Sequence, residues 1–71
     1  MTFHEACRSI VAHQGVHSVR YAIGYAKHGL LVSDPHEMKV QSLYILNNIT
    51  HWRGDIAKRV RESLKAVSKG A

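Results

Sequence analysis

The sequence predicts an all-α fold, a small bundle of four helices in one domain over residues 1–71. Three observations lead to this prediction. Apolar residues recur every three or four positions along most of the chain, which is the period of an amphipathic helix. No segment alternates apolar and polar residues with period two, as a half-buried strand would. The chain has 71 residues, 45% of them hydrophobic, which is enough for one hydrophobic core but not for two.

The first two helices are expected over residues 3–13 and 16–28. Thr2 and Glu5 have the spacing of a capping box, in which two side chains and two backbone N–H groups pair reciprocally, so the first helix begins at once. After Gly15 the apolar residues lie about half a turn away from the apolar face of the first helix. A continuous helix cannot bury both faces in one core, so we predict that the helix breaks at Gly15.

The third helix is expected over residues 35–48. Asp34 is a candidate cap, and Pro35 suits the first helical position because its backbone has no N–H to leave unpaired. The second helix should end before this segment, with Gly29 just beyond its last turn. The third helix is apolar around most of its circumference, and its narrow polar edge consists of Glu37, Gln41, Tyr44 and Asn48. Such a helix is expected to be central, with partners on more than one side.

The fourth helix is expected over residues 52–68 and is clearly amphipathic. Trp52 at its start should pack into the joint with the third helix. Two ion pairs at i,i+4 spacing are expected on its exposed side, Asp55 with Arg59 and Lys58 with Glu62.

A stripe of histidines and tyrosines on the second helix is the first candidate binding surface. It lies opposite the Val/Ile/Ala face and consists of His17, Tyr21, Gly24, Tyr25 and His28. Tyrosine has an apolar ring and a polar tip, and glycine allows another backbone to approach closely, so the stripe is typical of a protein interface. The alternative is that the second helix is sandwiched and its tyrosines belong to the core of the same chain.

A basic stripe on the fourth helix is the second candidate binding surface. The chain has ten Lys and Arg against five Asp and Glu, and the cations gather in the C-terminal half. The stripe and its flanks consist of Arg53, Lys58, Arg59, Arg61, Lys65 and Lys69. Such a stripe can contact nucleic-acid phosphates. The alternative is a solvated outer face, since no aromatic residue interleaves the stripe for base stacking.

Metal binding and catalysis find little support in the residues. His4 with Cys7 and His13 with His17 have helical spacings that could present two zinc ligands each. However, Gly15 interrupts the second pair, and no Cys-x-x-Cys or His-Glu-x-x-His motif accompanies them. Nothing marks an orienting group or an oxyanion site for a nucleophile. We therefore predict no enzyme, no catalytic residue, no cofactor and no metal, and keep a zinc-stabilised domain as a third hypothesis.

The cellular compartment is predicted from composition. Cys7 is the only cysteine, and a lone thiol suits the reducing cytoplasm. The first residues lack the basic and apolar regions of a signal peptide. No apolar run reaches the ~20 residues that span a bilayer.

The C-terminal half is similar to small uncharacterised proteins encoded by bacteriophages. The similarity covers residues 38–66 and is carried by two stretches, Val-Gln-Ser-Leu-Tyr-Ile-Leu-Asn-Asn at 40–48 and Trp-Arg-Gly-Asp-x-Ala-Lys-x-Val-Arg at 52–61. This resemblance implies a short phage accessory protein that binds a host protein or nucleic acid. It implies no activity and no site residue.

The preferred hypothesis is a small, non-enzymatic interaction or regulatory protein. It would self-associate as a homodimer through the second helix, or bind a host protein in the host-cell cytoplasm. The alternative is a nucleic-acid-binding protein that uses the basic face of the fourth helix. Neither a membrane nor a small-molecule substrate is expected as a partner.

Overall fold

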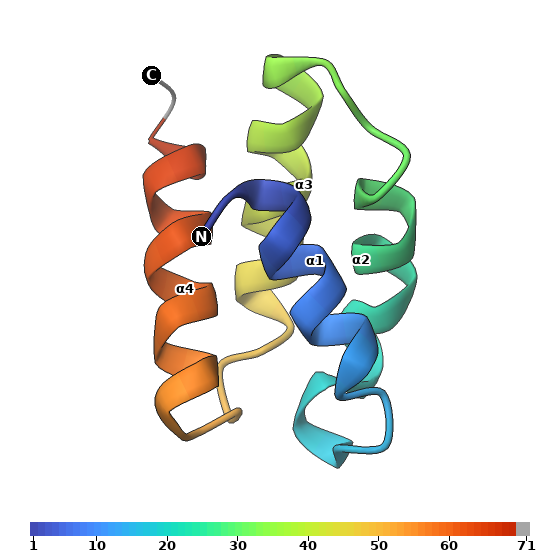
Figure 1. The fold of residues 1–71 in the computed structure, drawn as a ribbon, viewed down its shortest axis with the longest axis vertical. Helices are drawn as coiled ribbons and strands as arrows, with labels where there is room; N and C mark the ends of the chain where they lie inside the picture. The colour runs from blue at the N-terminus through green and yellow to red at the C-terminus, as the bar shows by residue number, and fades with distance from the viewer. Residues whose placement is uncertain (70–71) are drawn as a thin grey trace.

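Residues 1–69 are the part of the chain that the computed structural model describes, and helices dominate them (Figure 1). The elements are α1 (Phe3–Ala12), the 3-10 helix η1 (His17–Ala22), α2 (Ile23–Gly29), α3 (Pro35–Asn47) and α4 (Asp55–Ser68). No strand occurs in this part of the chain. The predicted all-α fold of four helices is confirmed.

Each α-helix packs against two others. α1 contacts α2 and α4, and α3 contacts the same two helices. In Figure 1, α1 lies in front of α3, between α4 on the left and α2 on the right. Helix α3 therefore has partners on more than one side, as predicted, but α1 has as many, so α3 is not uniquely central. Gln41 of its predicted polar edge is buried and Leu43 is exposed, so α2 and α4 leave the part of α3 around Leu43 uncovered.

Helix α1 begins and ends as its residues predict. The Thr2 Oγ1 accepts a hydrogen bond from the Glu5 backbone N–H at 3.1 Å, and the Glu5 carboxylate accepts one from the Thr2 N–H at 2.7 Å. These two bonds complete the capping box. The bond from the Thr2 backbone N–H lowers the pKa of the Glu5 carboxyl because it favours the charged carboxylate. The helix ends at Ala12 and the next four residues form a turn around Gly15, so the predicted break is confirmed.

The second predicted helix has two parts of different geometry. Its first six residues form η1, and only the last seven form α2. Val16 occupies the capping position of η1 without a side-chain hydrogen bond, so the free N–H groups at this end have no cap, and a tighter 3-10 turn is common at such a terminus. Residues three apart align in a 3-10 helix, and Val19 and Ala22 are accordingly both fully buried.

The α1–α2 contact depends on Gly29. A Cβ added at this glycine would lie 2.7 Å from the Cys7 Sγ and 3.0 Å from the Phe3 Cζ. Gly29 is the last residue of α2, and the only positive φ among residues 1–69 belongs to Gly54. The glycine predicted to follow the second helix is thus its final residue, and close packing rather than backbone conformation requires it.

The α3–α4 connection differs from the predicted one. α4 begins at Asp55, and Trp52 lies in the preceding turn rather than at the helix start. Gly54 separates the turn from the helix, with a φ of 116° that other residues rarely adopt. Trp52 is still buried, as expected of a residue at this joint. The centroid of its ring lies 5.3 Å from the ring centroid of His13, which follows the last residue of α1.

None of the helices in residues 1–69 combines the length and the apolar character needed to cross a membrane.

Candidate functional site

The predicted stripe of the second helix lies on the surface of the protein. His17 and Tyr21 belong to η1, and Gly24, Tyr25 and His28 belong to α2, and all five are exposed. The exposed fraction is 71% for Tyr21 and 40% for Tyr25. The alternative prediction, that these tyrosines fill the core, is therefore wrong.

Side chains of the stripe meet side chains of α3. The ring of Tyr25 stacks on the ring of Tyr44 with centroids 5.4 Å apart and an angle of 27° between the planes. The His28 Nε2 lies 3.8 Å from the Glu37 Oε1. The same Glu37 oxygen accepts a hydrogen bond from the Gln41 Nε2 at 3.1 Å. We call this surface the seam, and it consists of His17, Tyr21, Gly24, Tyr25, His28, Glu37, Gln41 and Tyr44.

The seam opens into a hollow at its η1 end. Its volume is about 390 Å³, and its lining consists of His17, Ser18, Tyr21, Asn47, Asn48, Thr50 and His51. Every one of these side chains can form a hydrogen bond, and none is a carboxylate. η1 and the turn that follows α3 form opposite sides of the hollow, and both lie at the lower end of the molecule in Figure 1.

Two arginines stand next to residues of the hollow. The guanidinium of Arg20 lies over the ring of Tyr21, 5.7 Å from its centroid. The guanidinium of Arg53 donates to the Thr50 carbonyl at 2.7 Å. The hollow thus has cationic neighbours and an acid-free lining.

Two buried polar atoms of α3 have no hydrogen-bond partner among the described residues. They are the Gln41 Oε1 and the Ser42 Oγ. The Gln41 side chain belongs to the seam, where only its Nε2 is bonded. Leaving a buried acceptor unpaired costs about 1–3 kcal/mol, so this part of α3 is less well satisfied than the capped ends of the helices.

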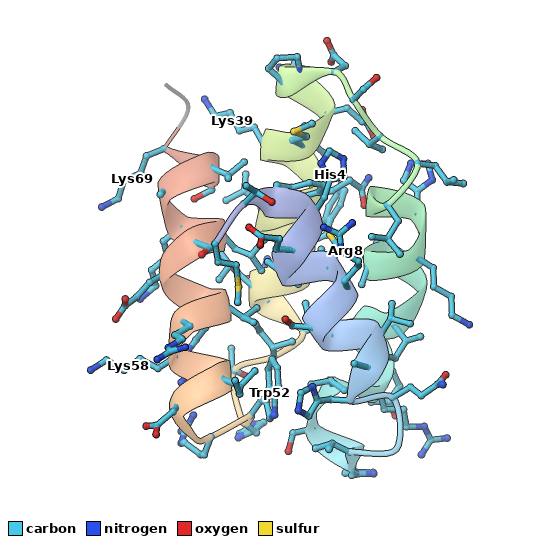
Figure 2. All side chains as sticks on the ribbon, viewed as in Figure 1. His4, Arg8, Lys39, Trp52, Lys58 and Lys69 are labelled. Atoms are coloured by element: carbon cyan, nitrogen blue, oxygen red, sulfur yellow. The ribbon has the colours of Figure 1, made fainter. Side chains whose placement is uncertain are left out.

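The predicted basic stripe divides into two groups. Arg61 is half-buried and donates to the Trp52 carbonyl, and Arg53 donates to the carbonyls of Thr50 and Trp52. These two arginines therefore hold the α3–α4 turn, which is a structural role. The remaining cations of the stripe are exposed, namely Lys58, Arg59, Lys65 and Lys69. Figure 2 shows Lys58 and Lys69 extending from α4 away from the bundle.

The two ion pairs predicted on α4 do not form. The one pair within 4.0 Å in residues 1–69 is that between His28 and Glu37. Exposed pairs at i,i+4 spacing gain only ~0.2–0.5 kcal/mol, which is too little to hold long side chains in one conformation. Asp55 and Glu62 nevertheless lie beside Lys58 and Arg59 around a shallow hollow on α4, so acidic and basic groups share this face.

The side chains considered as zinc ligands have other roles. The His4 Nε2 donates to the Val32 carbonyl at 2.5 Å, and the His13 Nδ1 donates to the Ser9 carbonyl at 2.6 Å. Cys7 is fully buried, and burial raises the pKa of its thiol to about 11. No three His, Cys, Asp or Glu side chains in residues 1–69 gather in a group that could hold a metal ion.

Sequence reasoning missed the α3 half of the seam and most of the hollow. Only the structure identifies the following residues as parts of a candidate binding surface: Ser18, Glu37, Gln41, Tyr44, Asn47, Asn48 and Thr50. The sequence predicts Tyr44 on the polar edge of the third helix, with no binding role. Helical spacing groups Glu37, Gln41, Tyr44 and Asn48 on one edge, but only the structure shows that Tyr44 of this edge meets α2.

Comparisons with protein families, with curated proteins and with solved structures found no match for this chain. The resemblance of residues 38–66 to bacteriophage proteins therefore stays a prediction.

Proposed function

We propose that this chain is a non-enzymatic interaction protein that forms a homodimer through the seam. The observation that carries the proposal is a set of neighbouring tyrosine rings left in solvent. The exposed fraction of Tyr44 is 48%, close to that of its stacking partner Tyr25, and Tyr21 exposes more than either. Tyrosine is enriched at protein interfaces, where its ring supplies contact area and its hydroxyl supplies a hydrogen bond.

The distribution of charge supports a second copy of the chain as the partner. The formal net charge is +5, so two copies repel each other over most of their surfaces. The seam is different, because Glu37 is its only Lys, Arg, Asp or Glu, and that carboxylate lies near His28. Depletion of charge is typical of the centre of an interface. The seam residues themselves therefore contribute little like charge to repel a second copy.

The backbone at Gly24 supports the same proposal. A Cβ added there would meet no atom within 4 Å beyond its own stretch of helix, so this point of the seam is open. A two-fold axis running along the seam would set α2 of one copy against α3 of the other. Tyr25 of one copy would then approach Tyr44 of its partner over the open surface at Gly24.

The test is the solution mass of the full chain measured by sedimentation equilibrium over a range of concentrations. We expect the wild type to dimerise and the Tyr21→Ala/Tyr25→Ala variant to be a monomer under the same conditions. Leu31→Ala is the matched control, because Leu31 is an exposed apolar residue outside the seam, and it should leave the dimer unchanged. A monomeric wild type, or a dimer that survives the double change, would contradict the proposal.

Nucleic-acid binding through α4 is the second candidate function. The supporting observation is the group of exposed cations at Lys58, Arg59, Lys65 and Lys69, which could each neutralise a phosphate. The candidate is weaker because Asp55 and Glu62 share that face. We expect salt-sensitive binding of DNA or RNA that falls in the Lys58→Glu/Lys65→Glu variant, measured by fluorescence anisotropy at two salt concentrations. An affinity that does not change with salt, or that is the same in the double variant, would reject this candidate.

A further inference from the structure

The hollow at the η1 end of the seam has a chemistry that self-association does not require. The seven residues that line it carry three hydroxyls, two imidazoles and two amides, and they are Ser18, Tyr21, Thr50, His17, His51, Asn47 and Asn48. A hollow of this volume is within the range of small-ligand sites, in which a few placed polar groups fix the orientation of the ligand.

Most of these groups are free to bind a ligand. The side-chain polar atoms of His17, Ser18, Asn47, Thr50 and His51 make no hydrogen bond to residues 1–69. Asn48 is the exception, because its Nδ2 donates to the Tyr44 carbonyl at 2.7 Å. That bond fixes the orientation of the amide and leaves its Oδ1 as an acceptor. The hollow therefore offers several donors together with one oriented acceptor.

The charges around the hollow favour an anionic ligand. No carboxylate lines it, and the guanidinium groups of Arg20 and Arg53 lie beside its lining residues Tyr21 and Thr50. Hydrogen bonds from N–H and O–H groups to a phosphate oxygen are charge-assisted and stronger than neutral ones. A phosphate group is the anion that such a set of donors fits.

The exposed ring of Tyr21 adds a stacking surface for a planar group. Arg20 covers the ring from one side, and the ring also lines the hollow. Aromatic rings beside cationic groups are the usual means of binding a base together with its phosphate, and each stacked base contributes about 1–3 kcal/mol. The Asn48 Oδ1 could accept a hydrogen bond from an exocyclic amino group of the base.

We propose that this hollow binds a nucleotide, with the phosphate among the donors and the base against Tyr21. The nucleotide is either a free monophosphate or one unit of a single strand, and both share this chemistry. The proposal depends on the polar lining and not on dimer formation, so it goes beyond the proposed function. It also revises the expectation that no small molecule is a partner.

The test is a titration of the ¹⁵N-labelled full chain followed by backbone amide chemical shifts. The probes are adenosine 5′-monophosphate, a single-stranded adenine tetranucleotide, adenosine and inorganic phosphate. We expect the two nucleotide probes to shift residues 17–21 and 47–51, and adenosine and phosphate to bind at least tenfold more weakly. Tighter binding of the tetranucleotide than of the monophosphate would identify a single strand as the source, and equal or weaker binding would identify a free nucleotide.

Asn47→Ala/His51→Ala is the variant that tests the site. Both residues are exposed and neither side chain holds the fold, so the variant should keep the wild-type melting temperature. Loss of hydrogen bonds to a charged group should weaken binding about tenfold or more. Glutamine keeps an N–H donor at position 51, so the variant with His51→Gln in place of His51→Ala should bind nucleotide more tightly than the double alanine variant.

Tyr25→Ala separates this proposal from self-association. Tyr25 belongs to the seam but does not line the hollow, so this change should weaken the dimer. Nucleotide binding measured below the concentration of dimer dissociation should be unchanged, since His17 and Tyr21 of the hollow also belong to the seam. The nucleotide proposal is overturned if neither nucleotide probe shifts the hollow, if the shifts lie on α4, or if inorganic phosphate binds as tightly as the nucleotides. A chain that is monomeric yet binds nucleotide at the hollow would refute only the dimer.

Discussion

The two sides of α2 are built in opposite ways. Toward α1, the helix presents small residues that are fully buried, and Gly29 brings its backbone against the Cys7 side chain. Toward α3, it presents Tyr25 and the preceding η1 presents Tyr21, and both rings remain in solvent. Seven residues of α2 therefore serve a close-packed contact on one side and an open seam on the other.

This difference shows how a short chain obtains both a core and a binding surface. Small side chains let two helices approach until no space remains, and the buried thiol and ring then gain dispersion contacts. Large amphipathic side chains keep two helices apart and leave their polar tips accessible. Stability is expected to depend on the α1 side of α2, and binding on the α3 side.

The largest effect expected from this division concerns neighbouring residues of η1. Val19→Ala removes fully buried methyl groups and should lower the free energy of unfolding by about 2–3 kcal/mol. Tyr21→Ala removes a ring that is mostly exposed and should change it by less than ~0.5 kcal/mol. Thermal unfolding followed by circular dichroism, at a concentration below dimer dissociation, measures both.

The expected division between a stabilising side and a binding side would be wrong if Tyr21→Ala lowered the free energy of unfolding as much as Val19→Ala. Such a result would mean that the tyrosine packs in the folded chain more than its exposure indicates. The low concentration matters because the proposed dimer would raise the apparent stability of the wild type by mass action.

The two glycines of α2 provide a matched pair of changes. Gly29→Ala forces a methyl group against the Cys7 Sγ and the Phe3 ring, and it should destabilise the fold by about 1–3 kcal/mol. Gly24→Ala meets open space and should be neutral or stabilise by up to ~1 kcal/mol, because alanine favours a helix over glycine. Chemical denaturation of each variant gives the two values.

A double change identifies the cause at Gly29. In the Gly29→Ala/Cys7→Ala variant the sulfur that the new methyl group meets is absent, so the two costs should be less than additive. Additive costs would show that the destabilisation does not come from crowding against the Cys7 Sγ.

The alkaline pH dependence of stability tests the buried thiol of the same contact. Burial raises the pKa of Cys7 from its ordinary 9.0 to about 11, so the unfolded chain loses this proton first as the pH rises. Stability should therefore decrease between pH 9 and pH 11, by about 1 kcal/mol at pH 10. Because tyrosines and lysines also titrate in this range, the measurement is the difference between the wild type and Cys7→Ala in urea denaturation. Parallel curves for the two proteins would contradict the burial of the thiol.

The fold was predictable to the extent that local signals determined it. The capping box at Thr2, the cap and proline at residues 34–35 and the break at Gly15 all act within a few residues of chain. The 3-10 geometry of η1 and the late start of α4 were not predicted. The first reflects a helix end without a cap, and the second reflects the positive φ of Gly54, and neither follows from apolar periodicity.

Only the η1 and α2 half of the candidate site was predictable from the sequence. Helical spacing identified the stripe on η1 and α2, because those residues share one segment of sequence. Its partner residues on α3 could not be assigned, since no local signal says which edge of α3 faces α2. The hollow joins residues 17–21 to residues 47–51, and that pairing depends on the path of the whole bundle. The roles of Arg53 and Arg61 were missed for the same reason, because both bind carbonyls of the α3–α4 turn.

The smallest expected effect concerns the tyrosine stack that joins α2 to α3. Tyr25 and Tyr44 are both partly exposed, so their coupling should be near the lower end of the range for aromatic pairs, about 0.5 kcal/mol. A double-mutant cycle with Tyr25→Leu, Tyr44→Leu and both changes measures it by chemical denaturation. The cycle is run at two protein concentrations, below and above dimer dissociation. If the stack acts within one chain and also supports the interface, the coupling is present at low concentration and grows at high concentration. A coupling free energy of zero at low concentration would mean that the two rings do not stabilise each other in the single chain. The position of α2 beside α3 would then depend only on the packing of α2 against α1.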